Sequence, residues 1–277
     1  MDDQEFARVL DGPVLRAAQE RIRGKVHRTP LLSTTTLGDR VGVRLFLKCE
    51  NLQKTGSFKP RGALNKVLSL SSAERSKGIV TVSAGNHAQA VAWAARLVGV
   101  PCAVVMPSDA PRSKVEAVRG YGAEIVFHDD RGTLFVKLAE VRDARGMTFV
   151  HPFDDPVVLA GAGTVGLEIL EDLPDVDVVV VPVGGGGLLG GVASAVKQLR
   201  PAARIVAVEL AVVTEDELAG AMRALATRAK LVAEGSGAAA TAALLSGRIS
   251  VRPGSTVVTI VSGGNVDADR LAAVLAS

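Results

Sequence analysis

The chain has 277 residues, of which 48% are hydrophobic and 22% charged, and its net charge is +3. This composition is typical of a folded globular protein and excludes a largely disordered chain. Basic residues are spread along the sequence without a Lys/Arg block or an aromatic-interleaved basic stripe, so we expect no nucleic-acid partner.

Three features bear on where the protein works. Cys49 and Cys102 lie beside apolar runs, and two cysteines are too few for a disulfide framework or a Cys-based metal site. The acidic start, Met1–Glu5, lacks the positive and apolar segments of a signal peptide. The uncharged stretch 178–196 contains Pro182 and six glycines, which favours a strand–loop–helix over a membrane span. We therefore expect a cytoplasmic protein without membrane association.

Helical spacing of apolar residues alternates along the chain with short β-branched runs. We expect a helix beginning near Lys59 and others over residues 14–26, 88–98, 112–121, 134–145, 160–170, 188–199, 215–230 and 238–245. We expect strands over residues 43–47, 78–83, 100–106, 124–127, 148–150, 176–183, 205–209 and 257–261. This alternation predicts parallel sheets covered by helices, in two α/β domains that share one cleft.

The stretch Lys48–Gly62 passes from a strand through a polar loop into a helix whose first turn holds Lys59 and Pro60. Proline is tolerated there because its missing N–H would be unpaired anyway. A lysine beside a helix N-terminus lies against the positive end of the dipole, which disfavours its charged form. A neutral amine is a nucleophile, but most lysines are solvated surface groups, so the local pattern does not decide.

Four glycines, Gly184–Gly187, come directly after a predicted strand and open a predicted helix at Leu188. Consecutive glycines let the backbone approach a ligand, and free N–H groups at a helix start form an anion nest. The pattern is neither a GxGxxG fingerprint nor a P-loop, so a dinucleotide or nucleoside triphosphate fits poorly. We favour a phosphate site over a tight structural turn.

Two further strand ends carry polar loops. Residues 83–87, Ser-Ala-Gly-Asn-His, offer a hydroxyl, a carboxamide, an imidazole and helix N-terminal amides, which suit a carboxylate. Ser and Asn are also ordinary capping residues, and His87 alone is compatible with a structural histidine. Residues 262–265, Ser-Gly-Gly-Asn, follow the last strand and either add a hydroxyl to the same cleft or form a plain turn.

In series, Ser-Phe-Lys-x-Arg-Gly, Ser-Ala-Gly-Asn-His-Ala-Gln, a tetraglycine loop and Ser-Gly-Gly-Asn resemble the pyridoxal-phosphate (PLP) enzymes of fold type II. The nearest group is the threonine/serine dehydratases and serine racemases. The resemblance runs from about Pro30 to the C-terminus and includes His-Pro-Phe-Asp at 151–154 and Glu-Gly-Ser-Gly-Ala at 234–238. It implies a homodimer and a tryptophan synthase β-like α/β fold, with two open, twisted, mainly parallel sheets flanked by helices and the cofactor in the interdomain cleft. We expect a small domain over residues 55–150 and a large cofactor-binding domain over residues 1–54 and 151–277.

The resemblance also implies residue roles. Lys59 would be the Schiff-base lysine, Asn86 would hydrogen-bond the cofactor's 3-oxygen, and Ser262 would face its pyridine nitrogen. The full set of implied cofactor-binding residues is Phe58, Lys59, Asn86, Gly184, Gly185, Gly186, Gly187, Leu188 and Ser262. The implied substrate-binding residues are Ser83, Ala84, Gly85, Asn86 and His87.

The implied reaction is β-elimination of water and ammonia from L-threonine or L-serine, with Lys59 as the base and the cofactor as electron sink. A 3-hydroxyaspartate dehydratase is an alternative that an extra cationic group would favour, and Arg131 is a candidate. A serine racemase-like enzyme is another, although Ala84 stands where the racemases carry an acid/base serine. A non-catalytic phosphate-ligand-binding protein is a third interpretation, which the presence of Lys59 opposes.

The connection after Glu209 is much shorter than in the family. Only Leu210 and Ala211 separate Glu209 from the matching segment Val212–Glu215, where the family has several dozen residues. That part usually completes the cleft and helps form a site for Mg²⁺ or another divalent cation, beginning at the residue matching Glu209. We favour a segment missing from this sequence over a true deletion, because loss of that wall should impair the enzyme.

Overall fold

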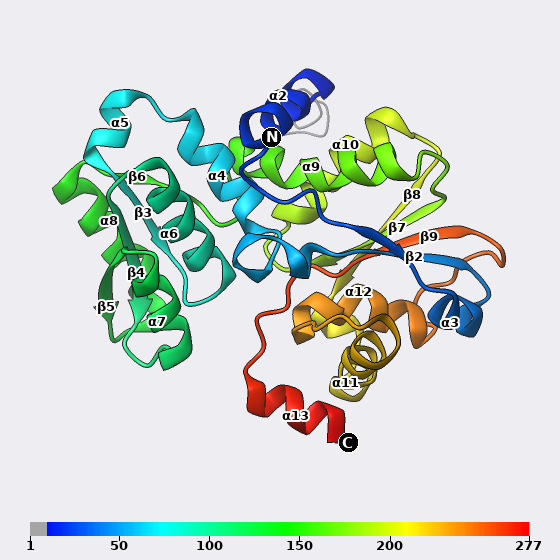
Figure 1. Ribbon diagram of the computed structural model, residues 1–277. Helices are drawn as coiled ribbons and strands as arrows, with labels where there is room; N and C mark the ends of the chain where they lie inside the picture. Colours follow the sequence, from blue (N-terminus) through cyan, green and yellow to red (C-terminus); the bar gives the residue numbers. More distant parts are fainter. Residues whose placement is uncertain (1–9, 277) are drawn as a thin grey trace.

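The computed structural model describes residues 10–276, so the acidic segment Met1–Glu5 lies outside the described residues. Figure 1 shows two lobes, each built around a β-sheet, with the chain crossing between them. No helix within the described residues combines the length and the apolar character needed to span a membrane.

The larger sheet has the strand order β1-β2-β9-β7-β8, and only β1 runs antiparallel to its neighbour. Its strands are β1 (Leu31–Ser33), β2 (Arg44–Lys48), β7 (Val178–Val183), β8 (Arg204–Glu209) and β9 (Thr256–Ile260). The smaller sheet is fully parallel, with the order β5-β4-β3-β6. Its strands are β3 (Ile79–Val82), β4 (Cys102–Pro107), β5 (Glu124–His128) and β6 (Thr148–Phe149).

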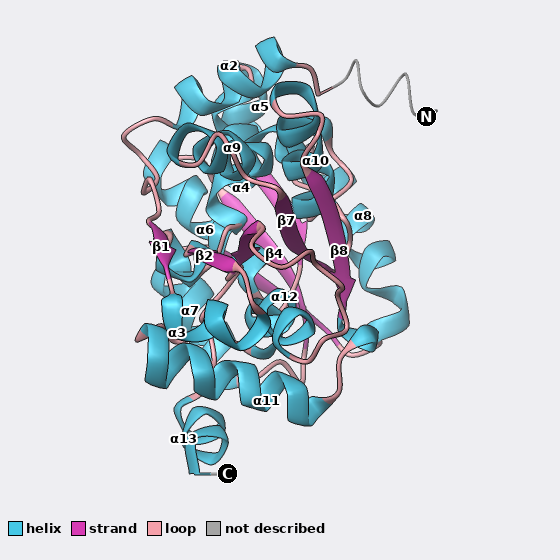
Figure 2. Ribbon diagram, turned by 90° about the vertical axis from the view of Figure 1, so that its right-hand side faces the viewer, coloured by secondary structure: helices cyan, strands magenta, loops and turns pink. Residues whose placement is uncertain are grey.

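Helices cover both faces of the larger sheet (Figures 1 and 2). One layer holds α2 (Gly12–Ile22), α9 (Pro156–Asp172) and α10 (Gly187–Leu199), and the other holds α3 (Thr35–Gly38), α11 (Glu215–Ala224) and α12 (Gly235–Leu245). Within β7, Val178 and Val180 pack with the α11/α12 layer, and Val179 and Val181 pack with the α9/α10 layer. A strand buried on both faces needs apolar residues at every position, which explains its unbroken apolar run.

The smaller sheet is covered in the same way by α6 (Asn86–Val98) and α7 (Arg112–Gly120) on one face and by α8 (Leu134–Arg145) on the other. The helices α4 (Lys59–Ser69) and α5 (Ser72–Lys77) lead into this lobe from the loop after β2. All four strands of the small sheet lie between residues 79 and 149. This distribution supports the domain division that we propose, with residues 55–150 as the small domain.

The fold class expected from the resemblance is confirmed, and most strand and helix positions agree with expectation. The predicted helix over residues 215–230 is interrupted, because α11 ends at Ala224 and η6 (Leu225–Ala229) continues as a π-helical turn. The turn ends at Lys230, whose φ of 60° is left-handed and incompatible with further helix. The helix α13 (Ala268–Ala276) was not expected. The short 3-10 turns are η1 (Asp39–Val41), η2 (Glu50–Leu52), η3 (Lys54–Gly56), η4 (Arg131–Thr133) and η5 (Leu210–Val212).

Candidate active site

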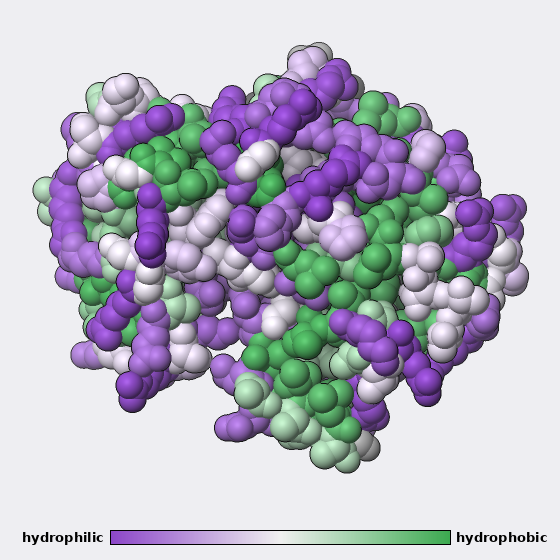
Figure 3. All heavy atoms as spheres, in the orientation of Figure 1, coloured by the Kyte–Doolittle hydropathy of each residue, from purple (hydrophilic) through white to green (hydrophobic). Residues whose placement is uncertain are grey.

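Four loops that follow parallel strands meet at one cavity between the two sheets. They follow β2, β3, β7 and β9 and carry, in that order, Lys59, residues 83–87, Gly184–Gly187 and Ser262. Open parallel sheets bind ligands beyond the carboxyl ends of their strands, so this position is the expected one. The space-filling view is hollowed between the lobe that carries α6 and α7 and the part of the molecule that carries α13 (Figure 3).

Backbone hydrogen bonds join the Lys59 loop to the segment after β9. The Phe58 N–H donates to the Ser262 carbonyl over 3.0 Å, and the Gly264 N–H donates to the Gly56 carbonyl over 2.9 Å. Ser57 and Gly263 form an isolated antiparallel bridge between these bonds. Two segments about 200 residues apart in sequence are thereby held side by side, which brings Lys59 next to Ser262.

The cavity has a volume of about 180 Å³. All nine residues expected to bind the cofactor line it, namely Phe58, Lys59, Asn86, Gly184, Gly185, Gly186, Gly187, Leu188 and Ser262. Of the residues expected to bind the substrate, Asn86 lines the cavity, whereas Ser83, Ala84, Gly85 and His87 do not. Their roles stay predictions.

Lys59 is the first residue of α4 and is half-buried. Its Nζ donates to the Pro152 carbonyl over 2.9 Å and lies 5.0 Å from the centroid of the Phe58 ring. Burial lowers the pKa of Lys59 to about 8, because desolvation disfavours the ammonium form. Near neutral pH the neutral, nucleophilic amine is therefore a larger fraction of Lys59 than of an ordinary lysine, although the ammonium form still predominates.

The glycines of the tetraglycine loop differ in what a side chain would meet. A Cβ on Gly185 would lie 2.2 Å from Cδ1 of Phe153, and Gly186 has a φ of +86°. A Cβ on Gly184 would meet nothing within 4 Å, and its backbone is not left-handed. The protein itself therefore does not require a glycine at position 184. The open space beside it, with the N–H groups that begin α10, fits the phosphate of a bound PLP.

His87 lies behind the cavity wall, 3% exposed. Its Nε2–H donates to the Val150 carbonyl over 3.1 Å, and its Nδ1 has no hydrogen-bond partner among the described residues. Burial, with a smaller contribution from the charge of Lys59, lowers the pKa of His87 to about 3. The imidazole is therefore neutral, and it supports the loop that carries Asn86.

Several residues that line the cavity were not singled out from sequence, chiefly Phe153, Glu234 and Ser236. Phe153 lies in the motif at 151–154, and Glu234 and Ser236 lie in the motif at 234–238. Both motifs are part of the family resemblance, so the sequence contained a signal for these residues. Asn86 Nδ2 donates to Glu234 Oε1 over 2.6 Å, and Asn265 Nδ2 donates to Asn86 Oδ1 over 2.8 Å. Burial raises the pKa of Glu234, against the opposing effect of the Asn86 hydrogen bond.

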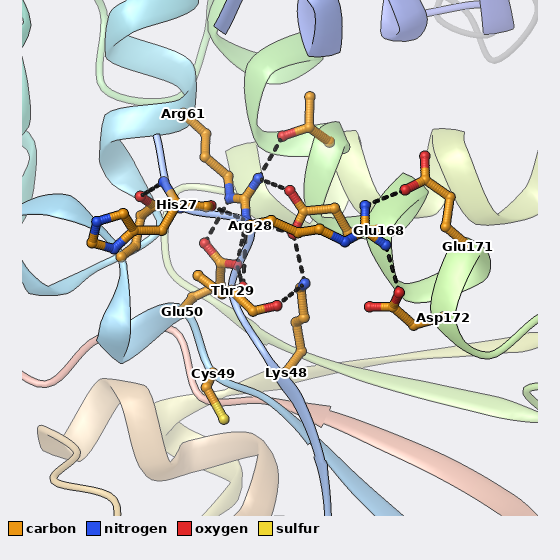
Figure 4. Close-up of polar contacts among 12 residues, drawn as sticks. His27, Arg28, Thr29, Lys48, Cys49, Glu50, Arg61, Glu168, Glu171 and Asp172 are labelled. Atoms are coloured by element: carbon orange, nitrogen blue, oxygen red, sulfur yellow. Dashed lines mark hydrogen bonds and ion pairs between the residues drawn. The ribbon is translucent and has the colours of Figure 1, made fainter. Parts of the chain in front are cut away.

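A buried ionic network lies directly behind the lysine helix (Figure 4). Arg61, two residues after Lys59, donates to both carboxylate oxygens of Glu50 over 2.8 Å and to Glu168 over 2.7 and 2.8 Å. Lys48 Nζ donates to Glu168 over 2.6 Å. All four side chains are at most 7% exposed, and their two positive and two negative charges balance. The network ties α4 to β2 and α9, so it fixes where the helix of Lys59 begins.

The short connection after Glu209 closes without a break. Leu210–Val212 forms the turn η5, and Thr214 caps α11 by accepting from the Glu217 N–H. Leu210 lines the cavity in this region. Glu209 is exposed, and the described residues contain no group of three or more His, Cys, Asp or Glu that suits a metal ion. The residues present therefore do not fit the divalent-cation site expected at Glu209.

Arg131 is the candidate for an extra cation that would bind an acidic substrate. Its Nη2 forms an ion pair with Asp109 Oδ1 over 2.7 Å, and both side chains are largely exposed. Arg131 does not line the cavity. The structure therefore gives no support to a role for Arg131 in binding substrate.

Comparisons with known proteins agree with this geometry. A family model described as pyridoxal-phosphate dependent enzyme matches residues 22–211. The chain is 40% identical to L-threonine ammonia-lyase of Thermotoga maritima, over 93% of this chain and 76% of that protein. It is 39% identical to catabolic L-threonine dehydratase of Escherichia coli K12, over 93% of each chain.

Solved structures are similar as well. Maize serine racemase matches with a TM-score of 0.91 and 36% identity, covering 96% of each chain. The threonine deaminase of T.th. matches with a TM-score of 0.85 and 38% identity, covering 93% of this chain and 99% of that one.

The alignments also measure how much this chain lacks. The match to the Thermotoga protein spans 309 positions, whereas 93% of these 277 residues is only about 258, so roughly fifty positions have no counterpart here. This shortfall agrees in size with the several dozen residues expected between Glu209 and Val212.

The family match and the relatives cover most of the chain, and the cavity has room for a phosphate beside a reactive lysine. The chain therefore belongs to the pyridoxal-phosphate-dependent enzymes.

Proposed function

We propose that this enzyme is an ammonia-lyase that converts L-threonine or L-serine into a 2-oxo acid and ammonia. The observation that carries the proposal is the convergence of Lys59, Gly184–Gly187, Asn86 and Ser262 on one cavity. Relatives named as threonine ammonia-lyase and threonine dehydratase, near 40% identity over most of the chain, support this substrate class.

The residues around the cavity suit PLP in one orientation. Gly184–Gly187 and the N-terminus of α10 would hold the phosphate, and Phe58 would border the ring. Asn86 would hydrogen-bond the 3-oxygen, and Ser262 would face the pyridine nitrogen. Bound there, PLP supplies the electron sink that makes the substrate Cα–H acidic.

Lys59 is the base of the proposed reaction. Its neutral Nζ accepts the Cα proton, and the electron pair left behind forms the Cα=Cβ bond as the Cβ–O bond breaks. The Lys59 ammonium formed in this step returns the proton to the departing hydroxyl, which leaves as water and restores the neutral amine. The released enamine then takes up water and hydrolyses to the 2-oxo acid and ammonia. Ser262 offers only a neutral hydroxyl to the ring nitrogen, so rapid loss of the β-hydroxyl is favoured over a long-lived charge at Cα.

The loop at residues 83–87 is proposed to bind the substrate carboxylate. It leads into the N-terminus of α6, where unpaired N–H groups and the helix dipole favour an anion. The Gly85 N–H donates to Ser83 Oγ over 3.0 Å, which holds the loop in a compact turn. This loop belongs to the small sheet, whereas the phosphate cradle belongs to the large one, so substrate would bind across the two.

A serine racemase-like activity is the second candidate, because maize serine racemase is a close structural neighbour. Ala84 opposes it, since an alanine side chain has no proton to exchange on the face opposite Lys59. We therefore expect little D-serine from L-serine, which chiral chromatography of recovered substrate would measure. The 3-hydroxyaspartate alternative has no support from Arg131, which pairs with Asp109 away from the cavity.

Two further expectations remain proposals. A homodimer is supported only by the resemblance. A cytoplasmic location is supported by two unpaired cysteines, Cys49 and Cys102, whose pKa values burial raises to about 12. Such thiols are inert and need no oxidising compartment.

The decisive experiment measures ammonia and 2-oxo acid release by the PLP-loaded protein. Threonine, serine and both diastereomers of 3-hydroxyaspartate are assayed in parallel, with and without magnesium. We expect threonine or serine to be the best substrate, and Lys59→Ala to abolish turnover. Absence of lysine-linked cofactor absorbance together with no 2-oxo acid from any substrate would contradict the proposal.

A further inference from the structure

A chain of hydrogen bonds crosses the cleft and passes through Asn86. It begins at the Thr55 carbonyl in η3, which accepts from Asn265 Nδ2 over 2.7 Å. The same Asn265 Nδ2 donates to Asn86 Oδ1 over 2.8 Å, and Asn86 Nδ2 donates to Glu234 Oε1 over 2.6 Å. Asn86 belongs to the small sheet's lobe, whereas Asn265 and Glu234 lie on segments attached to the large sheet.

The chemistry of the two ends fixes the direction of every bond in this chain. A backbone carbonyl can only accept, so the Asn265 amide must turn its nitrogen toward Thr55. The second hydrogen of that nitrogen is donated to Asn86, so the Asn86 side chain must turn its oxygen toward Asn265. At the other end the Glu234 carboxylate accepts, so Asn86 must turn its nitrogen toward Glu234. Neither amide can flip without losing two bonds.

One hydrogen of Asn86 is left over by this arrangement. Asn86 Nδ2 carries two hydrogens, and Glu234 is its only hydrogen-bond acceptor among the described residues. Asn86 lines the cavity, so its second N–H is available to an acceptor that binds there. A fixed donor of this kind suits a partly anionic oxygen attached to an aromatic ring.

The start of the chain shows backbone strain. Thr55 has a φ of 57°, a left-handed conformation that a β-branched residue rarely adopts. Asn265 also packs closely at this point, because a Cβ on Gly56 would lie 2.4 Å from Asn265 Oδ1. Strain of this kind persists only where surrounding contacts hold it, and it concentrates at functional sites.

We propose that Glu234 and Asn265 are positioning residues that hold the Asn86 carboxamide with one N–H directed at the 3-oxygen of PLP. This inference rests on the cofactor orientation given under the proposed function. It adds two residues, neither of which contacts the reacting atoms, that set cofactor affinity through a third. Because the bonds join segments from both sheets, they also hold the cleft at one width.

The test measures the dissociation constant of PLP from the apoprotein for four variants and for wild type. Glu234→Ala removes the acceptor, and Asn265→Asp replaces the donor with an acceptor that would turn the Asn86 amide around. Each should raise the dissociation constant of PLP about tenfold, because this is the change expected when one charge-assisted hydrogen bond is lost. Glu234→Gln keeps an acceptor oxygen and should stay within about threefold of wild type. Asn51→Ala is the matched control, because Asn51 makes a similar amide bond to the Val232 carbonyl outside the chain.

A PLP analogue without the 3-oxygen separates positioning from general loss of structure. Wild type should bind 3-deoxypyridoxal phosphate about tenfold more weakly than PLP, and Glu234→Ala and Asn265→Asp should weaken the analogue no further. Melting temperatures of each apoprotein show whether the variants fold. Equal loss of affinity for PLP and for the analogue would overturn the proposal, as would wild-type PLP affinity in both variants.

The outcomes distinguish this inference from the proposed function. Wild type that binds PLP but releases no 2-oxo acid contradicts the ammonia-lyase activity and leaves the affinity pattern as a separate result. Wild type that deaminates threonine while the variants bind PLP normally overturns only the positioning role. Failure of wild type to bind PLP at all overturns both.

Discussion

At the residue scale, the proposed chemistry of this enzyme needs Lys59 as a neutral amine. Its place at the start of α4 suggested a helix-dipole effect, but the structure assigns the main effect to burial, which lowers the pKa of Lys59 to about 8. The share of Lys59 that stays protonated donates a hydrogen bond to the Pro152 carbonyl and lies over the Phe58 ring. The Pro152 contact could not be found from helix position, because Pro152 is 93 residues away in sequence.

The pH dependence of cofactor capture follows from this pKa. Below about pH 8 Lys59 is mostly an ammonium ion, and above it the nucleophilic amine predominates. We expect the rate at which the apoprotein captures PLP covalently to rise as pH increases through about 8 and then to level off. Stopped-flow absorbance of the bound cofactor measures this rate. A rate that instead rises only near 10.5, the ordinary lysine value, would show that burial does not act on Lys59.

A second prediction at this scale concerns Gly184. A Cβ there meets no protein atom within 4 Å, so Gly184→Ala should leave the melting temperature of the apoprotein within a few degrees of wild type. The methyl group would occupy phosphate space, so PLP affinity should fall at least tenfold, judged from the value of the charge-assisted hydrogen bonds it would displace. Equilibrium titration with PLP checks this. The control is Gly220→Ala on α11, where a Cβ also meets nothing. Unchanged affinity would favour the structural-turn interpretation of the loop.

At the scale of elements, α4 carries the reactive lysine and is anchored by charges buried beneath it. Burial alone would raise the pKa of Glu168, yet hydrogen bonds and positive charge from Arg61 and Lys48 hold it below its ordinary value. A depressed folded-state pKa contributes stability above the ordinary value of 4.5, and this stability is lost as pH falls below it. The motif Ser-Phe-Lys-x-Arg-Gly thus places the proposed catalytic lysine and the anchoring Arg61 in one helical turn.

Arg61→Met should leave two buried carboxylates without their main partner. We expect it to lower the free energy of unfolding by about 3–5 kcal/mol at neutral pH. Arg28→Met breaks the half-exposed pair of Arg28 with Glu171 and Asp172 and should cost about 1 kcal/mol or less. Urea denaturation of both variants gives the comparison. Below about pH 4.5 the Arg61→Met deficit should shrink, because protonated carboxyl groups no longer need the cation; an unchanged deficit would point to lost packing instead.

At the scale of the whole molecule, the connection after β8 lies beside the cavity that carries Lys59. A second cavity of about 320 Å³ adjoins the first, and Leu210, Glu234 and Ser236 line both. Leu210 is 46% exposed, although it belongs to the wall of a cofactor site. The Thermotoga relative has roughly fifty positions without a counterpart in this sequence, and within the described residues the exposed Leu210 forms this part of the cavity wall.

The range of substrates should reflect the position of the second cavity beside the first. We expect the enzyme to accept 3-phenylserine as well as threonine, because a bulky side chain could extend past Leu210 into the second cavity. Leu210→Trp should lower kcat/KM for 3-phenylserine at least tenfold more than for threonine, within the range that pocket size can discriminate. Leu199→Trp, at an exposed position on α10, is the control. Equal effects of Leu210→Trp on both substrates would contradict a shared path between the cavities.

The sequence by itself determined most of the elements and predicted which residues would meet in the cleft. Alternating apolar and β-branched runs identify parallel strands because such strands are buried on both faces, and motifs at strand ends identify Lys59, Asn86, Gly184–Gly187 and Ser262. Only the tertiary structure decided which groups act on each other. Strand order places β9 between β2 and β7, and this non-local pairing brings Ser262 to Phe58 and Asn265 to Asn86. Contacts over such sequence separations leave no local periodicity, so the partners of Asn86, the burial of Lys59 and the placement of His87 required the folded chain.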